Sequence, residues 1–226
     1  MSSKDNRSDS DIWAVVLSSI LFSLLLLYVF TDQFSADFVS VAWMIPVFPI
    51  ISFGLIILFG KYDPRRGGSF ALVGVGLSSV FSMAVVFEVL FQDSLHGGFI
   101  ESTRTWFGGE TYSFEFGTYI DSLAAILLLV VGFVSYLVVL FSTSYMHEEG
   151  DRQVRYFGEI CLFVGVMLGL VIANSFLLMF IFWELVGVCS YLLIGFWYEK
   201  PSAASAAKKA FLVTRVGDVF LLLGLV

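Results

Sequence analysis

The sequence predicts an all-α polytopic membrane protein with about seven transmembrane helices and a short β-hairpin-like outer loop. Three observations support this fold class: the composition, a series of long uncharged segments, and basic residues confined to alternate loops. Of the 226 residues, 58% are apolar and only 14% are charged, whereas a soluble domain carries about 25% charged residues. A soluble surface needs more polar cover than this, so the composition excludes a soluble globular enzyme.

The uncharged segments have the length of transmembrane helices. A spanning helix needs about 20 mostly apolar residues, because lipid leaves exposed backbone polar groups unsatisfied. Crossings are therefore predicted at residues 12–30, 38–60, 67–87, 122–146, 156–173, 176–198 and 202–226. The fifth and sixth come from one stretch that would be about 60 Å long as a single helix. That stretch must fold back, and the polar pair Asn174 and Ser175 is the predicted break.

The lysine and arginine residues predict the orientation of these helices. Ten of the twelve fall on one predicted side, in the tail 1–11 and in loops 61–68, 146–155 and 199–209. The opposite side holds Arg104, and Arg215 lies inside a helix. Since short basic loops stay in the cytoplasm, the tail is predicted to be cytoplasmic. The long outer loop 92–118 contains an alternating segment, 111–118, that is typical of a hairpin strand.

A few charged residues lie at bilayer depth, where they cost free energy and usually face a bundle interior or a hydrated path. Glu184 lies near the middle of its predicted helix, and its own helix offers it no partner, so we expect it to be functional. Arg215 and Asp218 are three residues apart and share one face of the last helix. This pair fits a structural role and a functional role equally well. Lys208 shares the face of Arg215, whereas Lys209 points about 100° away.

The remaining ionisable residues carry no predicted function. Glu88, Asp121 and Glu159 lie near helix ends, where their side chains are expected to reach the headgroup region. The two cysteines and two histidines are Cys161, Cys189, His96 and His147. They are too few and too scattered for a zinc or iron–sulfur site, so we expect no metal and no cofactor in this chain. The net charge of −7 leaves no basic surface for nucleic acid.

Two stretches of the sequence resemble a known family. They are residues 182–198, FWELVGVCSYLLIGFWY, and residues 206–220, AAKKAFLVTRVGDVF. Both closely resemble subunit L of complex I, the NADH–quinone oxidoreductase subunit called chain 5 in mitochondria. Shorter segments at 43–49, 119–123 and 144–150 are also similar to that family. The resemblance extends from about residue 43 to the end of the chain.

The resemblance implies a proton-pumping, antiporter-like membrane subunit that works beside other antiporter-like and quinone-site subunits in a prokaryotic cytoplasmic membrane. Flavin, iron–sulfur clusters and quinone would belong to those partner subunits. Glu184 matches the family's proton-relay glutamate, and Lys209, Arg215 and Asp218 match charged residues of the following helix. The family match favours Lys209, whereas helix geometry favours Lys208, so both remain candidates.

The resemblance also suggests a division of the chain. The helix at 12–30 is an addition before the family's usual first crossing, residues 43–145 form the amino-terminal antiporter-like helices, and residues 146–226 begin the proton-translocating domain. Because the family continues with further helices, we expect this chain to be an amino-terminal part that needs a carboxy-terminal portion or a second chain. The alternatives are the large subunit of a multisubunit Na⁺/H⁺ antiporter and a truncated structural paralogue.

Overall fold

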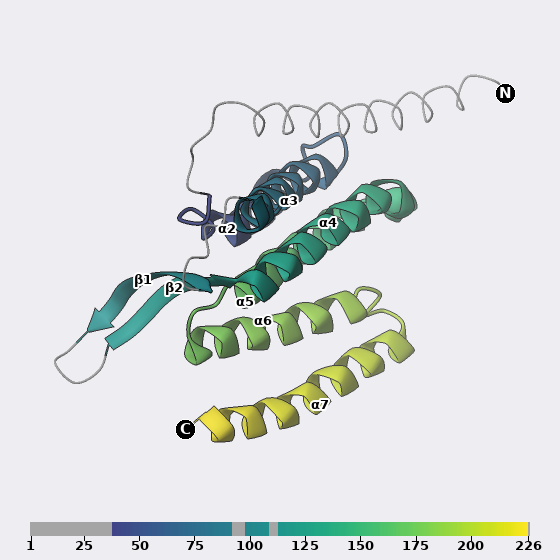
Figure 1. The fold of residues 1–226 in the computed structure, drawn as a ribbon. Coiled ribbons are helices and arrows are strands. Elements are labelled where there is room, and N and C mark those ends of the chain that lie inside the picture. The colour runs from purple at the N-terminus through teal and green to yellow at the C-terminus, as the bar shows by residue number, and fades with distance from the viewer. Residues whose placement is uncertain (1–37, 92–97, 109–112, 226) are drawn as a thin grey trace. The chain divides into compact units, whose positions relative to one another are not determined.

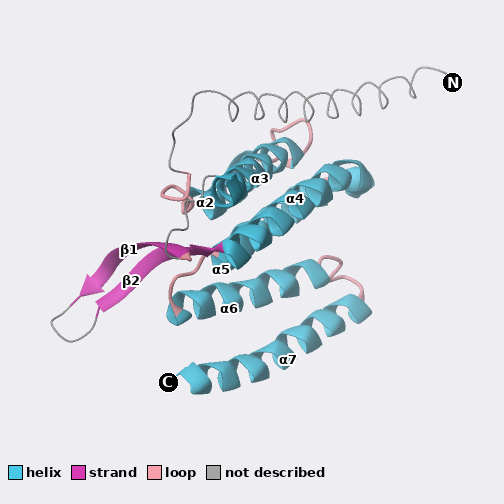
Figure 2. Cartoon of the chain, in the orientation of Figure 1, coloured by secondary structure: helices cyan, strands magenta, loops and turns pink. Residues whose placement is uncertain are grey.

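The computed structural model describes residues 38–91, 98–108 and 113–225, and these contain six α-helices and one two-stranded sheet (Figures 1 and 2). The helices are α2 (Met44–Phe59), α3 (Gly68–Phe91), α4 (Ser122–Tyr145), α5 (Arg152–Val171), α6 (Phe176–Ile194) and α7 (Pro201–Leu225). A 3-10 turn, η1 (Met146–Glu149), joins α4 to α5, and β1 (Phe99–Gly108) and β2 (Ser113–Asp121) form the sheet. The predicted all-α membrane fold with a hairpin is confirmed.

Four of the described helices are long and apolar enough to cross a membrane: α3, α4, α5 and α6. Helix α2 is apolar but has 16 residues, because residues 38–43, which were predicted to be helical, form turns. Helix α7 has 25 residues, but its four charged side chains make it less apolar than a typical span. The described residues therefore support four apolar spans. The predicted helix at 12–30 lies outside the residues that the structure describes.

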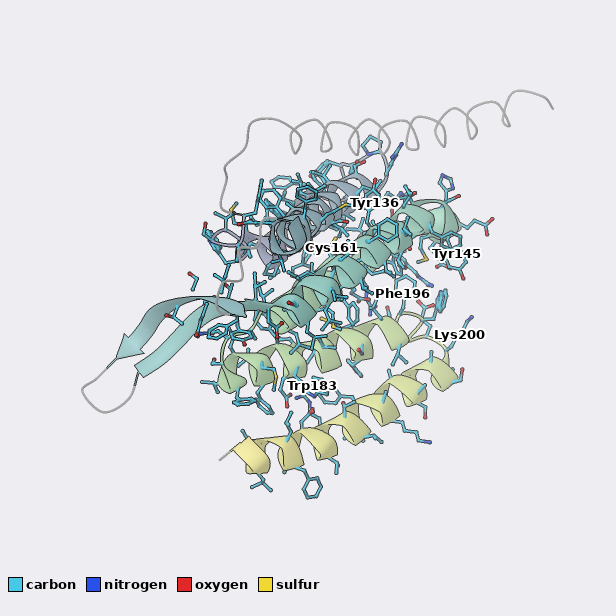
Figure 3. The ribbon with its side chains drawn as sticks, viewed as in Figure 1. Tyr136, Tyr145, Cys161, Trp183, Phe196 and Lys200 are labelled. Atoms are coloured by element: carbon cyan, nitrogen blue, oxygen red, sulfur yellow. The ribbon has the colours of Figure 1, made fainter. Side chains whose placement is uncertain are left out.

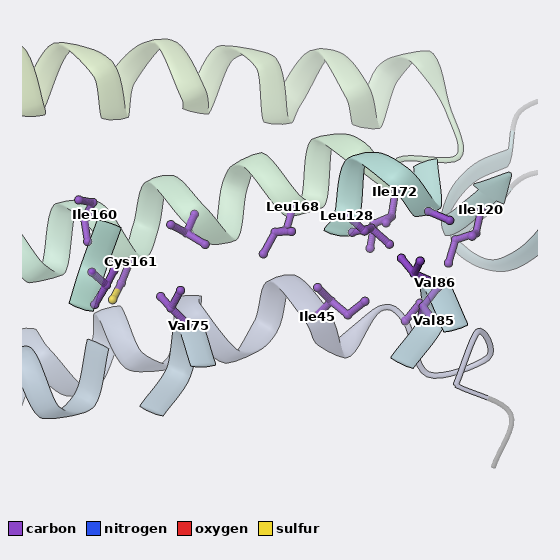
Figure 4. Packing of buried hydrophobic residues seen from close by; sticks show 14 of the residues in the cluster. Ile45, Val75, Val85, Val86, Ile120, Leu128, Ile160, Cys161, Leu168 and Ile172 are labelled. Atoms are coloured by element: carbon purple, nitrogen blue, oxygen red, sulfur yellow. The ribbon is translucent and has the colours of Figure 1, made fainter. Parts of the chain in front are cut away.

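The helices pack in a layered bundle whose core lies around α2, α3, α4 and α5 (Figure 4). Helix α5 contacts α2 on one side and α6 on another, and α7 packs against α6. Helix α5 is more deeply buried than α6: 56% of the α5 span is buried, but only 11% of the α6 span. The one acid of α5, Glu159, is therefore surrounded by protein, whereas the charges on α6 and α7 lie in a thinner part of the bundle.

The hairpin continues directly into α4. Strands β1 and β2 are antiparallel, with a register irregularity between Thr105 and Phe107. The observed strand β2 extends beyond the strand predicted at 111–118, because it ends at Asp121. The side chain of Asp121 caps α4 by accepting a hydrogen bond from the Ala124 backbone N–H at 2.7 Å. The backbone N–H of Tyr119 donates to the Ile172 carbonyl at 2.9 Å, which ties the hairpin to the end of α5.

Three basic loops meet at the end of the bundle opposite the hairpin (Figure 1). Ion pairs link them: Arg66 to Asp151, and Arg152 to Glu199 at 2.7 Å. The Trp197 indole N–H donates to Glu149 at 3.3 Å between the same loops. The loops after α2, α4 and α6 therefore share one end of the bundle, in agreement with the alternation of basic loops along the sequence.

Candidate functional site

Glu184 lies in the middle of α6, on the side that meets α7. The helix begins after Ser175, whose hydroxyl accepts a hydrogen bond from the Leu178 N–H at 3.3 Å. Trp183 and Leu185 on either side are partly exposed, at 49% and 39%, but the Glu184 side chain is only 23% exposed. The glutamate is therefore turned away from the outer surface of α6 and toward the neighbouring helix.

Arg215 of α7 is the ion-pair partner of Glu184. The arginine also approaches the Glu184 backbone carbonyl, with an Nη2–O distance of 3.4 Å. Its guanidinium carbon lies 4.6 Å from the centre of the Phe211 ring, a distance that allows a cation–π interaction. Glu184 has no ion-pair partner within α6, and α7 provides one.

Asp218 is the second acid at this interface. Its side chain is 8% exposed, and its Oδ2 lies 3.6 Å from Nη1 of Arg215. The Trp183 indole N–H donates a hydrogen bond to Asp218 Oδ1 at 2.9 Å, and Figure 3 shows Trp183 where α6 faces α7. We call Trp183, Glu184, Arg215 and Asp218 the α6–α7 charge cluster. It joins two carboxylates to a single guanidinium.

The two candidate lysines lie at the loop end of α7 and differ in what they face. Lys208 lines a cavity of about 230 Å³, together with Arg155, Tyr191, Leu192, Gly195, Tyr198, Ala204 and Ala207. Lys209, the next residue along α7, is exposed and is not part of this lining. Among the described residues, neither lysine forms a direct ion pair with the α6–α7 charge cluster.

Two acids expected near the headgroups are buried instead, and the sequence-based expectation for them is wrong. The Glu159 side chain is 8% exposed and accepts a hydrogen bond from Arg155 Nε at 2.6 Å. Glu88 is 5% exposed and accepts one from the Val39 backbone N–H at 3.2 Å. Glu159 is buried because α5 is covered on more than one side. The spacing of four residues between Arg155 and Glu159 is a sequence signal that could have revealed this pair.

The described residues contain no group of three or more histidine, cysteine or acidic side chains that could hold a metal ion. Cys161 and Cys189 are buried, free thiols on different helices. His147 is exposed in η1, and His96 lies outside the described residues.

Solved structures share this architecture. The membrane-bound sulfane sulfur reductase, an archaeal respiratory membrane complex, matches 82% of this chain and 36% of its own chain, with a TM-score of 0.67 and 21% identity. The Mrp complex from Dietzia sp. DQ12-45-1b matches 79% of this chain and 18% of its own, with a TM-score of 0.61 and 22% identity. The fold and the buried charges define a polytopic, integral membrane protein.

Two family models match parts of this sequence. Residues 106–157 match the model of "NADH-Ubiquinone oxidoreductase (complex I), chain 5 N-terminus". Residues 173–226, which include the whole α6–α7 charge cluster, match the model of "NADH:quinone oxidoreductase/Mrp antiporter, TM". The chain belongs to the complex I chain 5, or subunit L, family, and it corresponds to the amino-terminal portion of that family.

Two relatives illustrate the extent of the match. The F(420)H(2) dehydrogenase subunit L of Methanosarcina mazei is 43% identical over 185 residues, which cover 82% of this chain and 26% of that protein. The chloroplastic NAD(P)H-quinone oxidoreductase subunit 5 of Lemna minor is 40% identical over 195 residues, covering 81% of this chain and 25% of that protein. The chain thus spans about a quarter of the length of these relatives.

Proposed function

We propose that this chain is the proton-relaying, amino-terminal part of a membrane subunit of a proton-translocating quinone oxidoreductase of the complex I type. The observation that carries the proposal is the α6–α7 charge cluster, in which Glu184 and Asp218 share the guanidinium of Arg215. When both carboxylates and the guanidinium are ionised, one of the two negative charges has no countercharge. Within a membrane, such a site favours the uptake of one proton.

Within this proposal, Glu184 is the relay residue and the other charges adjust its affinity for the proton. When Arg215 pairs with Glu184, the glutamate stays ionised, and when the guanidinium shifts toward Asp218, Glu184 takes a proton. Trp183 keeps Asp218 in place through its indole N–H. Lys209, as the resemblance suggests, or Lys208, as helix geometry suggests, supplies a further cation at the loop end of α7.

The energy for transport comes from partner subunits in this proposal. Moving one proton against 100 mV costs about 2.3 kcal/mol, and the family consists of membrane subunits whose redox centres lie in other subunits. The proposed partners are antiporter-like and quinone-site subunits of the same complex. Electron transfer through their flavin, iron–sulfur clusters and quinone would reset the charges of the α6–α7 cluster.

We also propose the membrane arrangement and the division of the chain. The basic loops at one end of the bundle support a cytoplasmic location for that end. With α2, α7 and the segment 12–30 also crossing, the chain has seven crossings and a cytoplasmic tail at 1–11, in a prokaryotic cytoplasmic membrane. Residues 43–145 then form the amino-terminal antiporter-like helices, and 146–226 open the proton-translocating domain.

The test is Glu184→Gln in the assembled complex, with proton pumping and electron transfer measured in parallel. We expect pumping to fall at least about tenfold, because an amide cannot exchange the proton, while the helices remain folded. Glu199→Gln is the matched control, since Glu199 is exposed and pairs with an arginine at the loop end. Undiminished pumping in Glu184→Gln would exclude the relay role.

A second candidate function is the large subunit of a multisubunit Na⁺/H⁺ antiporter. It is supported by the family model over residues 173–226, which describes both the quinone oxidoreductases and the Mrp antiporter. The match of residues 106–157 to complex I chain 5 favours the first proposal. Flux that depends on Na⁺ and requires no electron transfer would favour the antiporter.

A further inference from the structure

Glu159 is a buried carboxylate whose second oxygen has no partner in the described part of the chain. Its side chain is more than nine-tenths buried, at 8% exposure. Oε1 accepts a hydrogen bond from Arg155 Nε at 2.6 Å. Oε2 is completely covered and has no hydrogen-bond partner among the described residues. A covered, unpartnered carboxylate oxygen is rare in proteins, since a buried acceptor normally receives a hydrogen bond.

The surroundings of Glu159 provide one countercharge. Helices α2 and α4, which pack near α5, carry no charged side chain. The titratable group of α6 that interacts with Glu159 is the thiol of Cys189, and Glu88 of α3 is engaged by the Val39 N–H. Within the described bundle, the charge of Glu159 is therefore balanced by Arg155, its neighbour on the same helix.

Arg155 makes further contacts while it pairs with Glu159. Its side chain is 41% exposed and lines the cavity that Lys208 also lines. Its guanidinium carbon lies 5.3 Å from the Tyr198 ring centre and 5.9 Å from that of Phe196. Figure 3 shows Phe196 at the loop end of the bundle, near the turn into α7. The arginine is thus placed between the buried carboxylate on one side and a cavity with aromatic walls on the other.

We propose that Glu159 binds an exchangeable proton on Oε2, and that Arg155, which contacts Glu159 and also lines the cavity, controls exchange with cavity water by breaking and re-forming its hydrogen bond to Oε1. At about 230 Å³, the cavity has room for several water molecules. When Arg155 releases Oε1 and turns aside, water from the cavity reaches the carboxylate, and a hydronium ion gives its proton to Oε2. An O–H bond forms, water remains, and the carboxyl becomes neutral. When Arg155 returns, the proton leaves to the cavity water.

The direction of this exchange rests on the proposed function, whereas the binding of the proton does not. Glu159 interacts with Cys189, which is five residues, or about 7.5 Å of helix, closer to the loop end of α6 than Glu184. Glu159 is therefore on the loop side of the α6–α7 charge cluster. In a pump that takes protons from the basic end of the bundle, it is a site for proton uptake that precedes Glu184.

The test is infrared spectroscopy of the full-length protein in lipid vesicles, prepared in H₂O and in D₂O. We expect a carboxylic acid C=O band that shifts in D₂O and is lost in Glu159→Gln. In Arg155→Gln the same band should be stronger at neutral pH, because the carboxylate has lost its countercharge. Glu199→Gln, a change to an exposed glutamate, should leave the band unchanged. Glu159→Asp keeps a carboxyl at the position and should move the band without removing it.

Two results would overturn the proposal. One is a set of carboxylic acid bands that Glu159→Gln and Glu159→Asp leave unchanged at every pH where the helices stay folded. The other is a Glu159 band that does not shift in D₂O, since its proton would then be closed to cavity water. Glu184→Gln separates this proposal from the relay role: unchanged pumping in that variant would exclude the relay, and the Glu159 band would still be present.

Discussion

The described part of the bundle contains two arginine–carboxylate arrangements that differ in how they are built. In α5, Arg155 and Glu159 are four residues apart on one helix. In the α6–α7 charge cluster, Glu184 comes from one helix and Arg215 and Asp218 come from another. Helix α5 by itself keeps the first two side chains within reach of each other, whereas the second arrangement forms only while two helices hold their relative position. A pair of the second kind can respond to movements elsewhere in a membrane complex.

The two arrangements also differ in their surroundings. The α5 pair lies in the well-packed part of the bundle, with the carboxylate 8% exposed. In the α6–α7 charge cluster, Asp218 is equally enclosed at 8%, but Glu184 is 23% exposed. The more accessible carboxylate, Glu184, is suited to passing a proton onward, and an enclosed carboxylate is suited to holding one. Substitutions in the two arrangements and in the exposed loop pairs test this contrast.

Arg215→Gln should have the largest effect on stability. It leaves Glu184 and Asp218 without their shared cation, and removing one partner of a buried ion pair costs about 3–5 kcal/mol. The free energy of unfolding, measured by denaturant titration in detergent, should fall toward the lower part of this range because the pair is partly exposed. Arg66→Gln, in an exposed pair, is the control, and an equal loss in the two variants would contradict the contrast between buried and exposed pairs.

Trp183→Phe should have an intermediate effect. It removes the indole N–H that donates to the buried Asp218, and an unsatisfied buried acceptor costs about 1–3 kcal/mol. The same unfolding measurement applies. Trp197→Phe removes a comparable donor to Glu149, whose side chain is 28% exposed and accessible to water. We expect a clearly smaller loss there, and the reverse order would show that Asp218 is not held by Trp183.

Arg152→Gln should have the smallest effect. It removes an exposed pair with Glu199 at 2.7 Å and a longer one with Glu149 at 3.7 Å, and exposed pairs contribute less than about 1 kcal/mol each. The loss should shrink further when unfolding is measured in high salt, because salt screens exposed charges. The effect of Arg215→Gln should change little with salt. A large, salt-independent loss in Arg152→Gln would mean that the basic loops are held together more rigidly than their exposure suggests.

Much of the bundle was predictable because helix ends depend on nearby residues. The segment predicted at 122–146 became α4, Ser122–Tyr145, which starts at the Asp121 cap and ends before His147. The break at Asn174 and Ser175 was also predicted, and α6 begins at the next residue. The prediction was less accurate for α2, since apolar composition does not distinguish the turns at 38–43 from a helix.

The charged residues show what could not be predicted. Glu184, Arg215 and Asp218 stood out in the sequence because they interrupt apolar helices. Spacing within one helix, however, does not say which face meets a neighbour, so the pairing of Glu184 with Arg215 required the packing of α6 against α7. Glu159 was expected near the headgroups, and only the packing of helices around α5 shows that it is buried.

The membrane class, most of the helical segments and the alternation of the basic loops follow from the amino-acid sequence alone. These features depend on local conditions: in lipid, each helix must satisfy its own backbone hydrogen bonds over a length set by its apolar residues. Only the tertiary structure decided which charges meet, which acid is enclosed and where the cavity lies. Those features depend on the faces that helices present to one another, and a buried charge is stable only where packing brings it a partner.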